Sequence, residues 1–395
     1  MTSFGTKLTA YKGIGPGFDF ARIGLALSVL FIHCSLLGLG GPDAASQPLF
    51  PGSPMARWAF DAWPLPMFFA LSGFLVAASA ERLSVGQFLI NRALRILPAL
   101  SVEIVLSALV LGPLLTSVAL GQYFSDPRFF SYFLNILGNI HYELPGLFLS
   151  NPQPGIVNGS LWTVPHEISC YAILTACLVV GLFRRRHLML LATLALFGLS
   201  IAIYLCDRFG VVLPHHQQLV YIFVTRGAAR LVPLFLTGIL FYQYREMIPH
   251  KAGIAIAAIG SYIAACFFGS PDWAANPIFC VLTAPAFAYV VAYVGLSPAF
   301  SIKALGHGDY SYGIYLYGYP LQQAMIQLMP WLKSTAAFFL LSAFAASVMA
   351  AFSWHMIEKP VLRLRKKFSL TAQLHAAPAP APKPAAPAGF AHPAE

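Results

Sequence analysis

Charge is the property that this 395-residue chain has least of. Asp, Glu, Lys and Arg together make up only 10% of the residues, whereas hydrophobic residues make up 58%. A water-soluble protein could not cover its surface with so few charged side chains. The composition therefore excludes a soluble enzyme and a soluble nucleic-acid-binding domain, and the mean hydropathy of +0.70 indicates a membrane protein.

Cysteine is also scarce. The six cysteines lie in or beside apolar segments without a paired spacing. They predict small core residues, and neither a disulfide framework nor a metal site. The chain also lacks a repeat of a few tens of residues, and it lacks the inverted repeat of broken helices that many transporters show.

Long hydrophobic runs, by contrast, are abundant. The first could be a signal sequence, but the runs that follow it indicate a membrane anchor. We therefore expect an all-α polytopic membrane protein with about ten transmembrane helices. The ten stretches cover roughly residues 20–40, 60–80, 96–119, 160–183, 187–206, 218–243, 251–268, 277–297, 310–330 and 334–356.

Lys and Arg residues gather on alternate connections between these stretches. With a cytoplasmic N-terminus, the inner side holds most of them, including the run 184–186 and the cluster from Lys359 to Lys367. The positive-inside rule then places both termini in the cytoplasm. The net charge of +10 is thus a topology signal. We expect the lipid bilayer as a partner, and no nucleic acid.

The chain divides into three parts. Residues 1–19 form a cytoplasmic N-terminal segment, and residues 20–367 form the transmembrane domain. Residues 368–395 are rich in Ala and Pro, have nothing to bury and predict a disordered cytoplasmic tail. The long outer connection from Gly121 to Gly159 carries aromatic residues and is expected to be functional; its middle, 129–140, is too short to span and is expected to be re-entrant or to lie in the interface.

His33 lies in the middle of the first hydrophobic stretch, eleven residues after Arg22. Eleven residues at about 100° each return to nearly the same helix face, about 16 Å along the axis. An ionisable side chain at this depth is costly and marks a candidate functional site. Arg22 would hold an anionic substrate at the membrane surface while His33 acts as a base inside. Taken alone, His33 could instead be a structural imidazole and Arg22 an interfacial anchor.

Two more stretches carry candidate chemistry. Arg92 and Arg95 lie at the inner mouth of the third stretch, three residues apart and so on one face. Two guanidinium groups match a phosphate or pyrophosphate, although positive-inside anchoring explains them as well. Glu167, about two turns into the fourth stretch, needs a partner or a change of protonation. We expect it to bond His33 and to fix the tautomer of the imidazole.

The remaining polar groups have structural explanations beside the functional ones. Arg226 and Arg230 form a basic face of the sixth stretch, with Asp61 and Glu103 as candidate counter-ions. The tyrosines that open the ninth stretch suit an aromatic belt or a sugar-binding wall. Small residues near the end of the second stretch favour close helix packing. The candidates for substrate binding or structure are Asp19, Ser72, Trp162, Arg226, Arg230, Tyr312 and Tyr315.

Seven motifs follow one another along residues 18–365. They are Asp19 with Arg22 and His33, Phe-Phe-x-Leu-Ser-Gly-Phe-Leu at 68–75, Arg-x-x-Arg at 92–95 with Pro98, Ser-Leu-Trp-Thr-x-Pro-x-Glu at 160–167, Arg230 before 235–238, the tyrosine-rich block 311–319, and Glu-Lys-Pro at 358–360. Each motif is weak alone, but the order is specific. In this order the chain resembles the acyltransferase-3 family of integral membrane acyltransferases.

The resemblance implies a ten-helix enzyme of the bacterial cytoplasmic (inner) membrane. It would take an acyl group, usually acetyl, from cytoplasmic acyl-CoA and deliver it to a hydroxyl of an envelope polysaccharide or of a glycolipid sugar. Acyl-CoA would be a co-substrate, with no permanently bound cofactor. His33 and Glu167 carry over as catalytic residues, and Arg22, Arg92 and Arg95 as donor-binding residues. The chain departs from the family at Pro66, where many members have Asp, and in ending with a short tail.

Some alternatives stay open. Intramembrane Arg, Glu and His are equally natural in a transporter or flippase of a glycan or lipid intermediate, and a non-catalytic scaffolding subunit is a third hypothesis. For the enzyme, His33 could be a general base or could carry the acyl group as an acyl-imidazole. The sequence does not distinguish acetyl from succinyl or another short acyl group, and it names neither the acceptor nor the oligomeric state.

Overall fold

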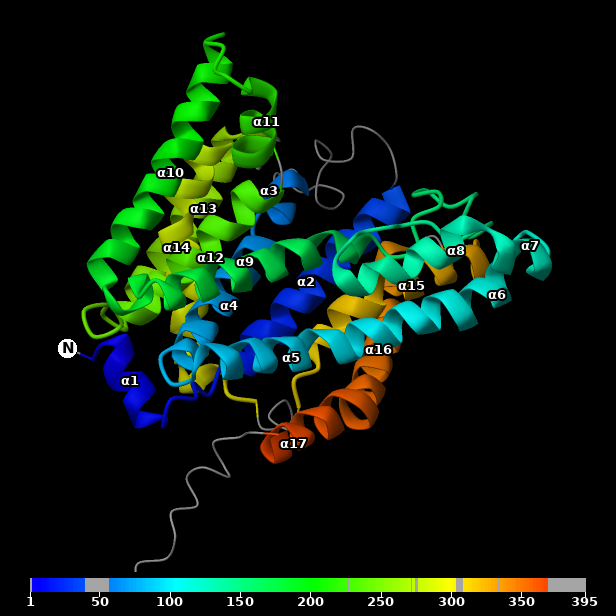
Figure 1. Cartoon of the computed structure of the whole chain (residues 1–395), viewed down its shortest axis with the longest axis horizontal. Coiled ribbons are helices and arrows are strands. Elements are labelled where there is room, and N and C mark those ends of the chain that lie inside the picture. The colour runs from blue at the N-terminus through cyan, green and yellow to red at the C-terminus, as the bar shows by residue number, and fades with distance from the viewer. Residues whose placement is uncertain are drawn as a thin grey trace, which may run out of the picture.

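The computed structural model describes residues 2–39, 57–225, 227–270, 272–273, 276–302, 308–332 and 334–368. Within these residues every regular element is a helix, and the one β contact is an isolated bridge between Ser3 and Pro249. Helices that are far apart in the sequence pack side by side (Figure 1). The predicted all-α fold is confirmed. The predicted tail after residue 368, and Arg226, lie outside the described residues.

Helices occupy all ten predicted hydrophobic stretches. They are α2 (Phe18–Leu39), α3 (Arg57–Asp61) with α4 (Pro64–Ala80), α5 (Val85–Leu106) continued by η2 (Ser107–Leu111) and α6 (Gly112–Leu115), α9 (Val164–Val179), α10 (Arg186–Arg208), α11 (His216–Val220) with η6 (Tyr221–Thr225) and α12 (Gly227–Gln243), α13 (Ala252–Phe268), α14 (Pro277–Gly295), α15 (Ser311–Leu328) and α16 (Thr335–Ser353).

Fewer than ten of these helices could cross a membrane by their own length and composition. Among the described residues, six are long and apolar enough, and a seventh results if the pair His216–Thr225 and Ala229–Gln243, bent by 53°, counts as one span. Helices α9 and α13, with 16 and 17 residues, fall short of the length that a bilayer needs. Six or seven such helices mark a multi-pass membrane protein, and the count of ten stays a prediction.

Helix α5 begins earlier than the sequence predicted. Its first residue is Val85, eleven residues before the expected start, because Ser84 and Gln87 form a capping box. The Ser84 hydroxyl accepts from the Gln87 backbone N–H, and the Gln87 side chain accepts from the Ser84 N–H. Arg92 and Arg95 therefore lie two to three turns inside α5 rather than at its mouth, where they face neighbouring helices.

Helices α4 and α12 approach each other through two glycines. A Cβ atom at Gly73 would overlap the carbonyl oxygen of Phe235, and a Cβ at Gly238 would overlap that of Ala70. Small residues at a crossing allow such close contact of two backbones in a membrane. The packing role predicted for the second stretch is thus met at Gly73, one residue after Ser72.

A buried polar contact joins α2, α15 and α16. Gln322 on α15 is fully buried, and its Nε2 donates to the carbonyl oxygen of Leu30 at 3.0 Å. The same nitrogen lies 2.9 Å from the sulfur of Cys34 and 3.3 Å from the hydroxyl of Ser342. All six cysteines are free thiols, four of them buried, in agreement with their predicted role as small core residues.

The connection between α6 and α9 packs on the helices as an ordered cap. It contains α7 (Leu120–Ser125), α8 (Pro127–Tyr132) and η3 (Phe133–Leu137), none of which is long enough to span. Buried asparagines fasten it: Asn151 donates to the carbonyl oxygen of Gln323 at 2.9 Å, and Asn158 to that of Leu316 at 3.0 Å. The cap continues through η4 (Gly159–Thr163) into α9, and so sets the position of α9.

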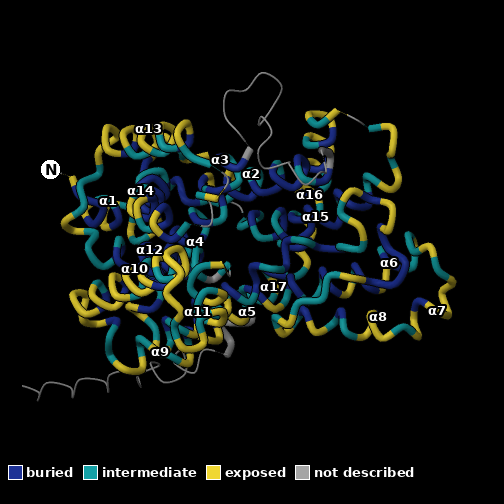
Figure 2. Tube along the Cα trace, turned by 90° about the horizontal axis from the view of Figure 1, so that it is seen from above, coloured by how far each residue is buried: buried dark blue, intermediate teal, exposed yellow. Residues whose placement is uncertain are grey.

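Burial separates the inside of the bundle from its rim. Figure 2 shows exposed segments along α7, α8, α10 and α13 and buried ones between them. Large apolar side chains on the rim, such as Ile256 and Phe344, are about 70% exposed, as expected for helices that face lipid. Helix α1 (Phe4–Ala10) packs at one end, and a π-helical turn, η10 (Trp354–Glu358), leads from α16 into α17 (Lys359–Phe368).

Candidate active site

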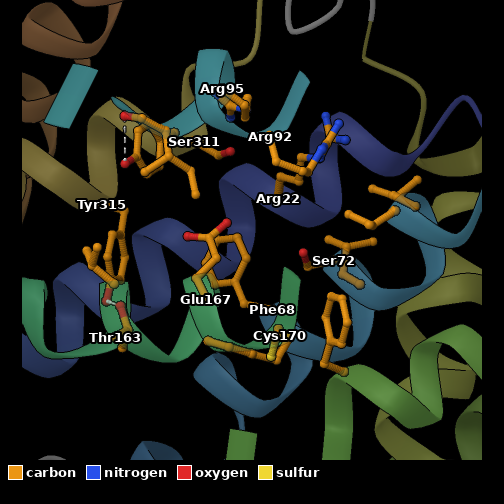
Figure 3. Close-up of a pocket in the computed structure, with 18 of the residues that line it drawn as sticks. Arg22, Phe68, Ser72, Arg92, Arg95, Thr163, Glu167, Cys170, Ser311 and Tyr315 are labelled. Atoms are coloured by element: carbon orange, nitrogen blue, oxygen red, sulfur yellow. Dashed lines mark hydrogen bonds between the residues drawn. The ribbon is translucent and has the colours of Figure 1, made fainter. Parts of the chain in front are cut away.

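A cavity of about 160 Å³ lies where α2, α4, α5, α9, α12 and α15 meet. Figure 3 shows its arginines on one side, Thr163 and Tyr315 together on another, and the Glu167 carboxylate between them. Candidate residues that were predicted on five different helices therefore meet at one cavity. The predicted site residues that line the cavity are Arg22, Ser72, Arg92, Arg95, Glu167, Tyr312 and Tyr315.

Arg95 is held by two carboxylates. Its Nη2 lies 2.7 Å from Oδ2 of Asp309, and its Nη1 lies 2.6 Å from Oε2 of Glu358. The guanidinium also lies over the ring of Tyr312, 5.0 Å from its centroid. The π-helical turn η10 contains Glu358, and such turns often adjust the position of a functional side chain. Arg95 thus joins α5 to the ends of α15 and α16.

Asp309 is shared by two arginines. Besides Arg95 it accepts from Nη1 of Arg22 at 3.2 Å, and its other oxygen accepts from the Ser311 hydroxyl at 2.6 Å. Burial opposes its negative charge, but the guanidinium groups of Arg95 and Arg22 outweigh burial and hold the pKa of this carboxyl well below its usual range. Asp19, as predicted in the same motif, approaches Arg22 at 3.4 Å.

Arg92 is not paired in this way. Within the described part of the chain it makes no ion pair and no hydrogen bond, and its Nε is buried without an acceptor. Its guanidinium lies over the Tyr171 ring, 5.8 Å from the centroid. A guanidinium that faces a cavity with free N–H groups is suited to bind an anionic or carbonyl oxygen of a ligand.

Glu167 makes a side-chain hydrogen bond within its own helix. Its Oε1 accepts from the hydroxyl of Tyr171, one turn further along α9, at 2.5 Å. The carboxylate nonetheless lines the cavity, where it is an acceptor opposite the arginines (Figure 3). The cavity therefore combines donors on one side with an acceptor in its middle.

Hydroxyl groups form the far side of the cavity. The hydroxyls of Thr163 and Tyr315 lie 2.6 Å apart, and the Tyr315 hydroxyl donates to the carbonyl oxygen of Ser160 at 2.9 Å. Thr163 belongs to η4 and Tyr315 to α15, so this contact joins the cap to the bundle. It places hydroxyl groups and an aromatic wall at the end of the cavity remote from Arg95.

His33 does not lie where the sequence predicted. It is not among the residues that line the cavity, and within the described residues no hydrogen bond joins it to Glu167. Its ring is 9% exposed and meets that of Tyr319 edge to face, with centroids 5.0 Å apart. The predicted His33–Glu167 bond is therefore wrong for this structure, because Glu167 faces the cavity and His33 does not line it. Tyr319 is one turn beyond Tyr315 on α15, so His33 lies beside the side chain that follows the hydroxyl end of the cavity.

Other predicted residues lie away from the cavity. Trp162 packs against His166, with ring centroids 5.6 Å apart. Arg230 lies on α12, within electrostatic reach of Asp61. Glu103 is not the arginine counter-ion that was predicted. Glu103 is buried and accepts from the Ser107 hydroxyl at 2.8 Å and from the Asn158 amide at 3.0 Å. Neutral donors from the same helical segment and from the adjoining cap thus take the place of an arginine.

The sequence reasoning missed the two acidic partners of Arg95. Glu358 belongs to the Glu-Lys-Pro motif but was given no role, and Asp309 was not singled out. A charge count could have found them: the chain has 24 basic but only 14 acidic residues. An acidic residue beside an apolar stretch is therefore a strong candidate to pair with a buried arginine. Thr163 was missed as well, and its place in the Ser-Leu-Trp-Thr motif was the available signal.

The chain is similar to known proteins over nearly its whole length. It is 26% identical over 373 residues to an O-acetyl transferase of Shigella phage Sf6, an alignment that covers 89% of this chain and 98% of that protein. It is 26% identical over 374 residues to nodulation protein 10 of Rhizobium leguminosarum bv. viciae, with 90% of this chain and 95% of that protein covered. No solved structure matches the chain.

The family model described as an acyltransferase domain, that of the acyltransferase-3 family, matches residues 16–356. This range contains every helix that lines the cavity. The resemblance found in the motifs is thereby confirmed. The chain belongs to the acyltransferase-3 family and is an acyltransferase.

Proposed function

We propose that this protein is a membrane O-acyltransferase that moves an acyl group, acetyl in the simplest case, from cytoplasmic acyl-CoA to a hydroxyl group of a cell-envelope saccharide. The observation that carries the proposal is the cavity in which the unpaired Arg92 faces Glu167 and the Thr163–Tyr315 hydroxyl pair. The similarity to the O-acetyl transferase of Shigella phage Sf6 supports transfer to oxygen.

The donor would bind from the side of the arginines. Arg92 is the candidate for direct contact because it has free N–H groups, and Arg22, which is held at 3.2 and 3.4 Å, can exchange a carboxylate for the ligand at small cost. Arg95 is held more tightly, and we assign it to supporting the cavity. Glu167 has one oxygen free of Tyr171, which can accept from the amide N–H groups of the pantetheine arm.

The acceptor would enter from the opposite end, past the hydroxyl pair and Tyr319. We assign the proton transfer to His33, because within the described residues its imidazole has no hydrogen-bonding partner and it lies next to Tyr319. The imidazole takes the proton of the acceptor hydroxyl, the acceptor oxygen attacks the thioester carbonyl, and CoA leaves as its thiolate. General-base catalysis of this kind contributes about 10²- to 10⁴-fold to a rate.

Binding the donor from the cytoplasm and the acceptor from the opposite side requires a defined membrane topology. We propose ten membrane crossings with both termini in the cytoplasm of a bacterial cell, so that the enzyme lies in the inner membrane. The short helices α9 and α13 then cross together with their flanking turns, and the polar α15 crosses inside the bundle, where α2 and α16 cover it. Cysteine labelling from the two sides of the membrane at residues 12 and 363 would test where the termini lie.

A transfer assay tests the function itself. The purified protein in lipid nanodiscs would be incubated with acetyl-CoA labelled in its acetyl group and with membranes that carry lipid-linked saccharides. The proposal expects labelled ester, released by mild alkali, in the saccharide fraction. Labelled acetyl-CoA that stays intact with every envelope fraction, although the protein is folded, contradicts it.

A further inference from the structure

A second hollow, of about 1000 Å³, opens where α4, α9 and α12 end and α5 and α10 begin. It shares no lining residue with the cavity of the candidate active site. Its wall includes the run Arg184, Arg185 and Arg186, which stands between η5 (Leu182–Arg184) and α10. The proposed function leaves this hollow without a role.

The hollow is strongly basic. Arg184, Arg185 and Arg186 are exposed, and within the described residues none of them makes an ion pair. Arg186 lies over the Tyr244 ring, 5.3 Å from its centroid. One carboxylate, Glu81, is present among the described lining residues, and it is engaged by Arg245 at 3.4 Å. The three arginines of the run are therefore left uncompensated and favour an anionic ligand.

The hollow also offers groups that suit a nucleotide base. The Nε2 of Gln243 donates to the carbonyl oxygen of Phe183 at 2.7 Å, which leaves its Oε1 buried without a donor. A buried acceptor without a partner costs free energy that an N–H group of a ligand can recover. Aromatic rings of Phe183 and Tyr242 lie in the same wall.

Four helices, α4, α5, α9 and α12, run from this hollow to the cavity. On α5, Val85 lines the hollow and Arg92 lines the cavity; on α12, Tyr242 lines the hollow and Phe235 the cavity. Seven residues of α-helix correspond to about 10 Å along the axis. The two sites are therefore separated along these helices by a span that a ligand with a polyanionic end and a long thin arm can cover.

We infer that the hollow at Arg184–Arg186 binds the 3′-phosphorylated nucleotide end of acyl-CoA, while the pantetheine arm passes along α5 to Arg92. This inference rests on the proposed function, and it refines that function by giving the phosphates a site separate from Arg92 and Arg95. Guanidinium groups bind phosphates through strong charge-assisted hydrogen bonds. Basic hollows at the cytoplasmic side also bind phospholipid headgroups, so the experiment has to separate the two sources of phosphate.

The test measures binding without turnover. The full-length protein in nanodiscs of zwitterionic lipid is titrated with adenosine 3′,5′-bisphosphate by calorimetry, as wild type and as the triple variant Arg184→Gln, Arg185→Gln, Arg186→Gln. We expect the Kd of the variant to rise at least about tenfold. A second triple variant, Lys12→Gln, Lys359→Gln, Arg363→Gln, removes three charges outside the hollow and should bind like the wild type.

A kinetic arm uses two donors. The KM for acetyl-CoA should rise in the Arg184–Arg186 variant with little change in kcat, and the rise should be smaller for acetyl-dephospho-CoA, which lacks the 3′-phosphate. Equal bisphosphate affinity in the wild type and this variant would overturn the inference. So would selective loss of phosphatidylglycerol, seen by native mass spectrometry, with nucleotide binding unchanged. Bisphosphate binding lost in the variant, with no acetyl transfer by the wild type, would support the hollow and refute the proposed reaction.

Discussion

Arg92 and Arg95 lie three residues apart on the same helix and line the same cavity, yet only Arg95 is ion-paired. Asp309 and Glu358 hold Arg95 at 2.7 and 2.6 Å, whereas within the described residues Arg92 has neither an ion pair nor a hydrogen bond. The two arginines of the Arg-x-x-Arg motif therefore have different physical roles. One stabilises the bundle, and the other is free for a ligand.

Substitution should separate these two roles. Arg92→Gln removes free charged donors from the cavity, so we expect the KM for acyl-CoA to rise about 10- to 100-fold while the melting temperature stays the same. Arg95→Gln leaves Glu358 without its arginine and Asp309 with Arg22 alone, and it should destabilise the fold by roughly 3 kcal/mol or more. Donor titrations and thermal melts of both purified variants check this. Equal melting temperatures for the two variants would show that the ion pairs of Arg95 do not matter.

The ion pairs of Asp309 with Arg95 and Arg22 predict that the stability of the fold depends on pH. Because the folded-state pKa of this carboxyl is held well below its usual range, its contribution is fully present above the ordinary Asp pKa of about 4 and is lost as the pH falls toward the folded value. Asp309→Asn should therefore melt below the wild type at pH 7, and the difference should shrink at pH 3. A difference that is the same at both pH values contradicts the assignment.

The crossing of α4 and α12 depends on the absence of two side chains. Gly73→Ala and Gly238→Ala each introduce a methyl group onto the backbone of the other helix and should cost about 1–3 kcal/mol. Gly198→Ala, on the exposed face of α10 with no atom within 4 Å of the added Cβ, should instead stabilise by about 0.5–1 kcal/mol. Chemical denaturation of the three variants in detergent measures the expected loss of stability at the two crossing glycines and the expected gain at Gly198.

Glu167 is expected to act on the donor. Glu167→Gln keeps the shape but loses the charge, so the KM for acyl-CoA should rise about tenfold and the kcat should fall less. Tyr171→Phe keeps the carboxylate and removes its hydrogen bond, and it should have a smaller effect of the same kind. Steady-state kinetics of the two variants provide the measurement. A larger loss of kcat than of donor affinity in Glu167→Gln would assign the carboxylate to the chemical step.

The sequence predicted much of this arrangement through local physics. Hydropathy located the helices because each stretch has to place an apolar surface against lipid or against other helices, and the three-residue spacing correctly placed Arg92 and Arg95 at one site. The sequence-based prediction failed where the contact depends on how two helices are rotated relative to each other. The His33–Glu167 bond required both side chains to face one cavity, but only Glu167 lines it; one partner of Glu103, Asn158, comes from a cap whose fold has no simple period.

The central claim is that acyl transfer takes place where the arginine-lined cavity approaches His33. Its most direct test compares the rate of labelled acetyl transfer in His33→Asn and His166→Asn, two variants that each replace one buried imidazole. We predict that His33→Asn loses at least about 100-fold in kcat and stays folded, while His166→Asn keeps most of its activity. A folded His33→Asn protein that transfers acetyl at a rate near that of the wild type would contradict the account.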